Sequence, residues 1–264
     1  MKNKILLVLF FFVFIVAKAG AQTIKLRQLG KSNMVFNITG AFVAKGVLYN
    51  IDNTGTLYKT KLDSGEHSSI GNVTFKNAKF IFGINNRIYV IETDGSMDQV
   101  DPVTGSWNVV ASMGTWTLPT ITITINNHLF TIENASLIYY PILNPRMGKQ
   151  RGESNFADIG MLMRTDSTLH SLIADGSLYE INTETGIWKK ILKNKTLRNS
   201  RAATVFNNKL YTSENSAGLV ETSLPDGARK ELDPKIQRAR MLFSDSGKLY
   251  IIDNDGTLYE IIVN

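Results

Sequence analysis

Short runs of alternating apolar and polar residues, separated by Asn, Asp and Gly, fill the chain after its first 21 residues. The clearest example covers residues 249–262, where two apolar runs flank an Asp-Asn-Asp-Gly segment. Alternation with a period of two predicts half-buried β-strands. Asn, Asp and Gly tolerate the positive φ of tight hairpin turns. No segment shows a convincing helical period, so the pattern predicts an all-β chain.

The hairpin of residues 249–262 recurs six times. We take the second residue of each Leu-Tyr-like pair as its anchor, and the spacings between anchors are 40, 41, 40, 41 and 39 residues. The anchors are Tyr49, Tyr89, Phe130, His170, Tyr211 and Tyr250. Four short strands in each period of about 40 residues are typical of a propeller blade. The sequence therefore predicts a six-bladed β-propeller with four antiparallel strands per blade.

The second repeat shows the four strands best, over residues 79–84, 87–92, 96–101 and 106–111. The third repeat is the poorest, because Pro141 and Pro145 interrupt its fourth strand, and proline removes a donor from a strand ladder. We expect a long loop over residues 144–155. The run Thr23–Leu29 has no partner strands before it, and the last repeat ends after three strands. We expect this run to pair with Tyr259–Val263 and close the ring, which removes an exposed sheet edge.

Residues 1–21 resemble a secretory signal peptide. Lys2 and Lys4 precede the apolar run Ile5–Ala17, and Ala19-Gly20-Ala21 fits a cleavage site. We expect a mature domain over residues 22–264 that is secreted or periplasmic and has no membrane span; a retained membrane anchor is the alternative. The chain has no cysteine, so neither disulfides nor cysteine chemistry can contribute. Without the three lysines of the leader, the net charge falls from +6 to +3, which does not indicate a nucleic-acid partner.

Superposing the repeats predicts two sets of charged positions on one face of the ring. Three residues after the anchors stand Asp52, Glu92, Glu133, Glu214 and Asp253, at the end of each second strand. Ten residues before the anchors stand the cations Lys79, Arg201 and Arg240, at the start of each first strand. Antiparallel neighbours bring these positions to the same face. One hypothesis is that this face holds a polar or anionic ligand; the other is that the acids only accept backbone N–H bonds at turns.

Other site chemistry has weaker support. The turns at Asp52-Asn53, Thr93-Asp94 and Asp253-Asn254-Asp255 offer oxygen ligands for calcium, but no known calcium-loop spacing is present, and we expect no metal and no cofactor. No catalytic motif surrounds the three histidines His67, His128 and His170. A hydrolase or lyase using Glu92, Glu133 and Arg201 stays open, because propeller sites combine distant blades. Trp107 and Trp188 hold equivalent places, which predicts packing between blades or, alternatively, a platform for a stacked ligand.

The unit Leu-Tyr-x-Ile-Asp-x-Asp-Gly-x-Leu-Tyr-x-Ile, followed by Thr-Gly-x-Trp as in residues 185–188, resembles the repeats of secreted propellers. It is most similar to tachylectin-like and tectonin-like sugar-binding propellers and, more loosely, to quinoprotein-like repeats. The resemblance covers nearly all of residues 22–264 and implies a binding role, but it assigns no ligand residue. We therefore expect a module that binds a glycan, a peptide or a cell-surface protein. An enzyme acting on a small polar or carbohydrate substrate is the alternative, and a structural scaffold is the third. The oligomeric state is not encoded in any pattern we recognise.

Overall fold

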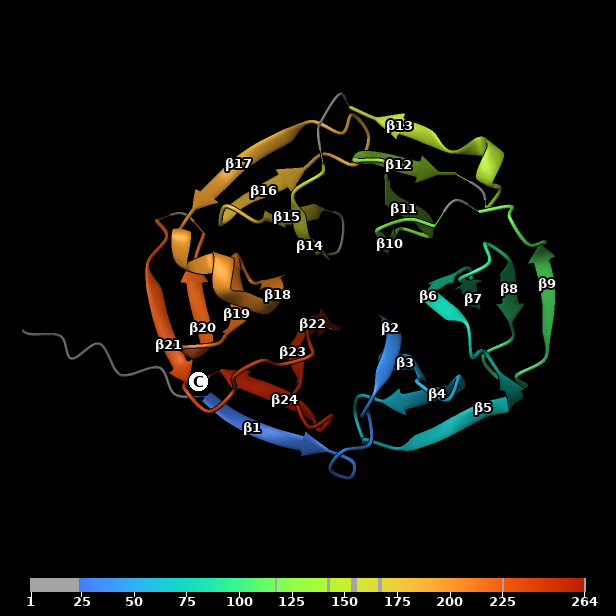
Figure 1. Ribbon diagram of the computed structural model, residues 1–264. Coiled ribbons are helices and arrows are strands. Elements are labelled where there is room, and N and C mark those ends of the chain that lie inside the picture. The colour runs from blue at the N-terminus through green and yellow to red at the C-terminus, as the bar shows by residue number, and fades with distance from the viewer. Residues whose placement is uncertain are drawn as a thin grey trace, which may run out of the picture.

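The computed structural model describes residues 24–116, 118–141, 143–152, 156–165, 168–224 and 226–263. Six four-stranded antiparallel sheets are arranged around a common axis (Figure 1), which confirms the predicted six-bladed β-propeller. In each sheet the first strand lies nearest the axis and the fourth lies at the rim. The predicted signal peptide lies outside the described residues. No helix among the described residues is long and apolar enough to cross a membrane.

The strand order of each blade runs from the axis outward. Blade one has β2 (Ile38–Ala44), β3 (Val47–Asp52), β4 (Thr56–Lys61) and β5 (His67–Thr74), and blade two has β6 (Ala78–Ile84), β7 (Arg87–Glu92), β8 (Met97–Val100) and β9 (Trp107–Ala111). Blade three has β10 (Ile121–Ile125), β11 (His128–Glu133), β12 (Ser136–Tyr140) and β13 (Lys149–Arg151), and blade four has β14 (Ile159–Arg164), β15 (Leu169–Ile173), β16 (Ser177–Ile181) and β17 (Trp188–Lys193). Blade five has β18 (Ser200–Phe206), β19 (Lys209–Glu214), β20 (Gly218–Ser223) and β21 (Arg229–Asp233), and blade six has β22 (Met241–Asp245), β23 (Lys248–Ile252), β24 (Leu258–Val263) and β1 (Ile24–Leu29).

The turns between first and second strands explain why these hairpins form. Three of them consist of an Asn-Asn pair, and both residues of each pair have positive φ: Asn85 and Asn86, Asn126 and Asn127, and Asn207 and Asn208. Two-residue turns of this kind match the right-handed twist of the flanking strands, and asparagine adopts the conformation more readily than most side chains. We call the side of the ring that carries these turns the hairpin face. The opposite side, where the first strands begin, is the entry face.

The fourth strand of blade three departs from the expectation of a long loop over residues 144–155. Residues 144–152 contain a short 3-10 helix, η1 (Pro145–Met147), and then β13, which pairs with β12 through residues such as Gln150 and Ile138. Residues 153–155 of the expected loop lie outside the described residues. Asn144 accepts a hydrogen bond from the backbone N–H of Arg146 and so caps η1. The prolines precede the strand rather than interrupt it, and a rim strand needs partners on one side only. A second 3-10 helix, η2 (Lys195–Asn199), precedes blade five.

Pairing between the two ends of the chain closes the ring, as expected. Strand β1 runs antiparallel to β24, with Ile24 opposite Val263 and Leu29 opposite Leu258. Arg27 Nε donates a hydrogen bond of 2.8 Å to the carboxylate of Glu260, which adds an ion pair across this junction. Leu29 is only 2% exposed and packs in the apolar core shared by the last and first blades. The closure therefore combines a backbone ladder, a buried side chain and a charge pair.

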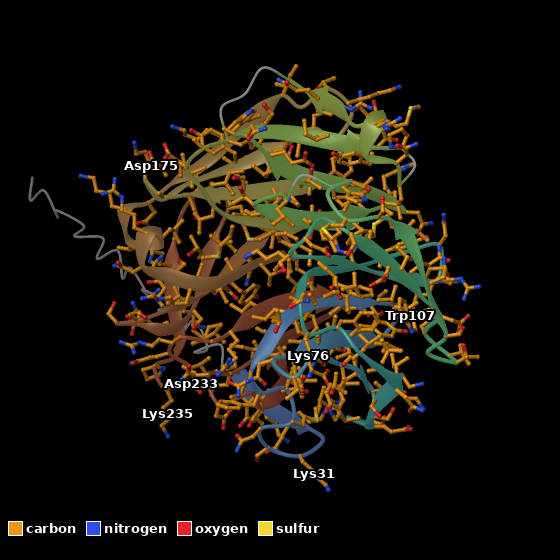
Figure 2. All side chains as sticks on the ribbon, turned by 45° about the vertical axis from the view of Figure 1, so that its right-hand side comes forward. Lys31, Lys76, Trp107, Asp175, Asp233 and Lys235 are labelled. Carbon is orange, nitrogen blue, oxygen red and sulfur yellow. The ribbon has the colours of Figure 1, made fainter. Side chains whose placement is uncertain are left out.

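Buried apolar side chains join neighbouring blades on the entry face. The residues 14 positions before the anchors are all buried: Val35, Phe75, Trp116, Phe156, Leu197 and Ile236. The backbone N–H of Phe75, for example, donates to the carbonyl of Gly55 in the preceding blade at 2.7 Å. Trp188 stacks on Phe156 with ring centroids 4.3 Å apart, and Trp107, at the rim in Figure 2, makes an edge contact with Phe75. Both tryptophans therefore contact the joints between blades.

Candidate functional site

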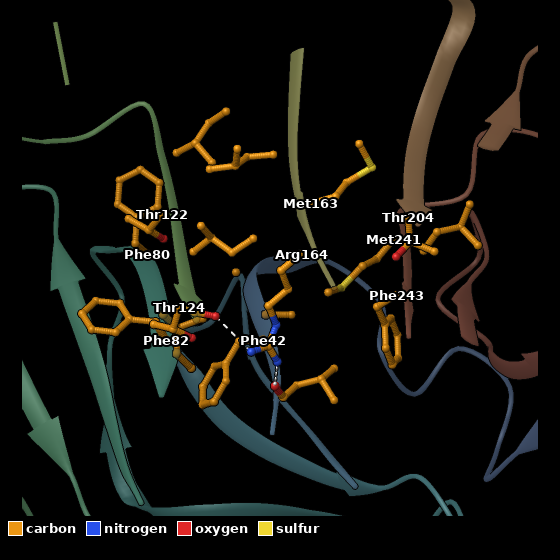
Figure 3. A pocket seen from close by; sticks show the side chains of 18 of the residues that line it. Phe42, Phe80, Phe82, Thr122, Thr124, Met163, Arg164, Thr204, Met241 and Phe243 are labelled. Carbon is orange, nitrogen blue, oxygen red and sulfur yellow. Dashed lines mark hydrogen bonds between the residues drawn. The ribbon is translucent and has the colours of Figure 1, made fainter. Parts of the chain in front are cut away.

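The six inner strands surround an axial cavity of about 390 Å³ (Figure 3). Every blade contributes to its wall at two successive levels. The wall residues of the first level stand eight positions before the anchors: Ala41, Ile81, Thr122, Leu162, Ala203 and Leu242. Those of the second level stand seven positions before the anchors: Phe42, Phe82, Ile123, Met163, Thr204 and Phe243. The axis thus encloses a chamber whose wall mixes aromatic, aliphatic and hydroxyl side chains.

The cavity extends from the entry face almost to the hairpin face. Its lining begins at Thr39, Lys79 and Thr120, ten residues before their anchors, and ends at the level six residues before the anchors. Among the described residues that line it, none belongs to the turns of the hairpin face. Four residues of strand separate the two levels, so the chamber is about 13 Å deep at 3.3 Å per residue.

Arg164, the last residue of β14, forms the floor of this chamber. Its Nη1 donates to the backbone carbonyl of Thr124 at 2.9 Å and its Nη2 to that of Val43 at 3.0 Å (Figure 3). Thr124 belongs to the neighbouring blade three, whereas Val43 belongs to blade one on the opposite side of the axis. Both carbonyls lie on inner edge strands, where backbone groups lack a further strand to pair with. The arginine side chain therefore spans the axis.

The chemistry of the lining favours negative charge. Two of its residues are cations, Lys79 near the entry face and Arg164 at the floor. Six more carry hydroxyl groups: Thr39, Thr120, Thr122, Thr124, Thr204 and Ser244. Within the described part of the chain, no Asp or Glu lines the cavity. The chamber can donate hydrogen bonds from several directions and offers two positive charges without an opposing carboxylate.

The three cations predicted from the repeats take different positions. Lys79 lines the cavity, with its Nζ 6.0 Å from the ring centroid of Phe80. Arg201 Nε instead contacts Asn215 Oδ1 at 3.3 Å. Arg240 Nε donates to the carbonyl of Asn254 at 2.9 Å, so both arginines reach the turn after the second strand of their own blade.

The pairing of the inner strands is irregular at this level of the ring. In blades one, two, four and five the residue ten positions before the anchor is skipped in the pairing with the second strand, as a β-bulge. A bulge bends the strand and re-aims the side chain at that point. Lys79 and Arg201 both occupy such bulges.

The five predicted acids lie at the entry face but make contacts inside their own blades. Asp52 Oδ1 accepts from the backbone N–H groups of Thr54 and Thr56, both at 2.9 Å, as a turn cap. Glu133 accepts from Tyr140 at 2.9 Å. Glu214 is buried and accepts from Arg229 Nη2 at 2.7 Å. Asp52 thus makes the backbone contacts of the turn hypothesis, whereas Glu133 and Glu214 accept from side chains, and the ligand role of the acids stays a prediction.

The carboxyl groups of Glu92 and Asp253 have raised pKa values. Burial raises the pKa of Glu92, and the nearby carboxylates of Asp98 and Asp94 raise it further, while a hydrogen bond with Asn77 opposes the shift. Burial likewise raises the pKa of Asp253. The triad weighed for a hydrolase or lyase, Glu92 with Glu133 and Arg201, comes from blades two, three and five. No hydrogen bond or ion pair within the described ranges joins its members.

The histidines are packed rather than placed in the cavity. His170 is 4% exposed, and burial lowers its pKa. His67 stacks on Tyr58 with ring centroids 4.8 Å apart and shares a hydrogen bond of 2.8 Å with Thr60. The side chains that the structure describes form no group of three or more His, Asp or Glu suited to a metal ion.

Arg164 is the residue that our superposition of the repeats missed. Six residues before the anchors the other blades carry Val43, Gly83, Thr124, Val205 and Ser244, which are small or β-branched. A single long cation at that level is the signal that could have identified it. The predicted charged positions stand at the start of each first strand and at the end of each second strand, whereas Arg164 stands at the end of a first strand.

Comparisons with known proteins indicate the fold. No family model matches the chain, and no curated protein matches it. Virginiamycin B lyase from Staphylococcus aureus is structurally similar, with a TM-score of 0.57 at 10% identity over 91% of this chain and 100% of the lyase. A catalytically inactive variant of that lyase with quinupristin has the same TM-score at 12% identity, again over 91% and 100% of the two chains. BamB from Moraxella catarrhalis has a TM-score of 0.46 at 15% identity over 84% of this chain and 68% of its own. Identities this low establish similarity of fold alone.

Proposed function

We propose that this protein is a secreted or periplasmic binding module that takes the end of a glycan or peptide into its axial cavity from the entry face. The cavity itself is the observation that carries the proposal. Its volume of about 390 Å³ lies within the usual range of small-ligand sites, about 300–1,000 Å³. A rigid ring of six blades surrounds it, so a ligand would meet a preformed site and lose little affinity to reorganisation of the protein.

Two features support a polar ligand with some apolar surface. Thr122 lies beside Phe80 on one side of the chamber, and Thr204 lies beside Met241 on the other (Figure 3). Mixed walls of this kind suit sugars and peptide termini, which present both hydroxyl or amide groups and C–H faces. The resemblance of the repeats to tachylectin-like and tectonin-like sugar-binding propellers points the same way. A whole folded partner could reach the chamber only with a sugar or a peptide terminus that extends from its surface.

Glycan and peptide arrays probed with the purified protein test the proposal directly. The decisive variant is Thr122→Phe, which fills the chamber without changing charge. The matched control is Thr185→Phe, in the exposed turn between β16 and β17 far from the axis. We expect array binders that the control retains and the chamber variant loses. Binders that both variants retain would show that the binding site lies outside the axial cavity. An absence of binders on both arrays would count against the proposed binding function.

A hydrolase or lyase is the second candidate. Glu92 would act as its acid from the entry face, outside the lining of the cavity, where burial and two nearby carboxylates raise its pKa. A carboxyl group that holds its proton at higher pH suits a general acid. Incubation of array binders with the protein, followed by mass spectrometry, would reveal cleavage or elimination. Turnover that Glu92→Gln abolishes would establish the enzyme, whereas intact ligands after long incubation would leave binding as the whole activity.

A further inference from the structure

Arg164 is a half-buried cation on the axis of the molecule, and no carboxylate among the described residues pairs with it. We propose that the axial cavity binds an oxyanion group, carried as a carboxylate, sulfate or phosphate by the ligand, and that Arg164 holds this group at the floor. The proposal rests on the binding function above and defines the chemistry of its ligand.

The two hydrogen bonds of Arg164 position its guanidinium for this role. A guanidinium has five N–H donors in one plane. Two of them donate to the carbonyls of Thr124 and Val43, which lie on different blades and hold the group across the axis. No hydrogen bond is described for the other three donors. A planar donor array held in place from two sides is suited to a carboxylate or phosphate, which binds such a fork through two oxygens.

The surroundings of Arg164 make an uncompensated charge costly. Phe42 and Phe243 lie on the two sides of Arg164 in the lining of the chamber (Figure 3), and apolar walls lower the local dielectric constant. A cation removed from water is stable only when it is paired or well hydrogen-bonded, and two carbonyl dipoles supply only part of that compensation. An incoming anion would supply the rest, and its attraction to Arg164 would be stronger than at an exposed site.

A second cation marks the way into the chamber. Lys79 lines the mouth on the entry face, about 13 Å above the floor, and would attract an anion before it reaches Arg164. Hydroxyl groups lie at intermediate levels, including those of Thr122 and Thr204, and can donate to anionic oxygens. The nearby acids do not cancel this field inside the cavity, because residues such as Glu133 and Glu214 are held by contacts within their own blades.

Isothermal titration of the purified protein with sodium phosphate, sodium sulfate and sodium acetate at constant ionic strength tests the proposal. We expect saturable binding of at least one of these anions to the wild-type protein. Arg164→Met should weaken that binding about tenfold or more, since it removes charge-assisted hydrogen bonds. Arg146→Met is the matched control, because Arg146 is exposed in η1 far from the axis. Arg164→Lys should bind with intermediate affinity, because it keeps the charge but loses the planar fork.

A second variant keeps the test decisive if Arg164→Met does not fold. Ser244 lines the same level of the cavity as Arg164, so Ser244→Asp places a carboxylate inside the chamber that competes with any added anion. Loss of anion binding in Ser244→Asp and Arg164→Met, with the control unchanged, supports the proposal. Failure of all three anions to bind the wild-type protein, or equal binding by the wild-type protein and Ser244→Asp, overturns it.

The glycan and peptide arrays distinguish failure of the anion proposal from failure of the binding function. If only neutral glycans or peptides bind, and Thr122→Phe abolishes their binding, the cavity is a ligand site but not an anion site. If acidic ligands bind and depend on both Thr122 and Arg164, the same experiment identifies the source of the oxyanion, as an acidic sugar, a sulfated sugar or a peptide carboxylate.

Discussion

Leu29 provides the sharpest test of how the ring is held closed. This side chain is 2% exposed and lies in the core between the last and first blades, with Val35 and Leu258 among its neighbours. Replacing a buried leucine by alanine costs about 2–5 kcal/mol, from lost burial plus the cavity that is left. That is a large part of the roughly 5–15 kcal/mol by which a domain is usually stable. For a chain of this size each kcal/mol shifts Tm by about 2–4 °C, so Leu29→Ala should lower Tm by roughly 4–20 °C.

Calorimetry and urea unfolding of Leu29→Ala measure this effect, and Lys25→Ala is the control. Lys25 lies on the same strand, is exposed, and pairs with β24 through its backbone only. If β1 is an integral part of blade six, the whole unfolding transition shifts to lower temperature and lower urea concentration in Leu29→Ala and is unchanged in Lys25→Ala. Equal Tm values for the two variants, within about 1 °C, would show that β1 can detach without opening the ring and would refute the closure argument.

Three further predictions concern buried polar groups. Arg229→Met leaves the buried carboxylate of Glu214 without its cation and with only the hydroxyl of Thr212, which should cost about 3–5 kcal/mol in urea unfolding. Arg229→Met combined with Glu214→Leu should recover most of this loss, and equal losses in both variants would contradict this account. His170→Phe should remove an acid sensitivity. Burial lowers the folded-state pKa of His170, so the wild-type protein loses stability as pH falls below about 6.5, the unfolded value, and the variant should lose less; parallel pH curves would refute it. Asp98→Asn should stabilise the protein near pH 8. Burial raises the folded-state pKa of Asp98, so ionisation favours unfolding as pH rises above about 4, and the gain should vanish near pH 3; a gain independent of pH would point to another cause.

Local sequence was sufficient to predict the fold because each blade is built from short-range signals. The Asn-Asn and Asp-Gly turns set the hairpins, and the alternating runs between them set the register. The repeat period then specified six blades, and the unpaired first run specified how the ring closes. The prediction of a loop in blade three was wrong at β13. A proline interrupts a strand at its own position, but a strand can begin four residues after it.

The candidate site was only partly predictable. Superposition predicted Lys79, Arg201 and Arg240 together on one face of the ring. Lys79 lines the cavity, whereas the two arginines reach turns of their own blades. Lys79 and Arg201 both occupy bulges, so the different directions of their side chains follow from tertiary contacts, such as that of Arg201 with Asn215, and not from residue type.

The sequence by itself determined most of the strands, the turns, the six-fold repetition and the pairing of the chain ends, because each depends on neighbours in the chain or on a simple count of repeats. Only the tertiary structure decided what faces the axis. Arg164 meets the carbonyl of Val43, 121 residues away along the chain, because closure of the ring brings opposite blades within reach of one side chain. Contacts of that kind depend on the radius of the ring and on side-chain direction at a bulge or strand end, and neither follows from the order of residues in a single blade.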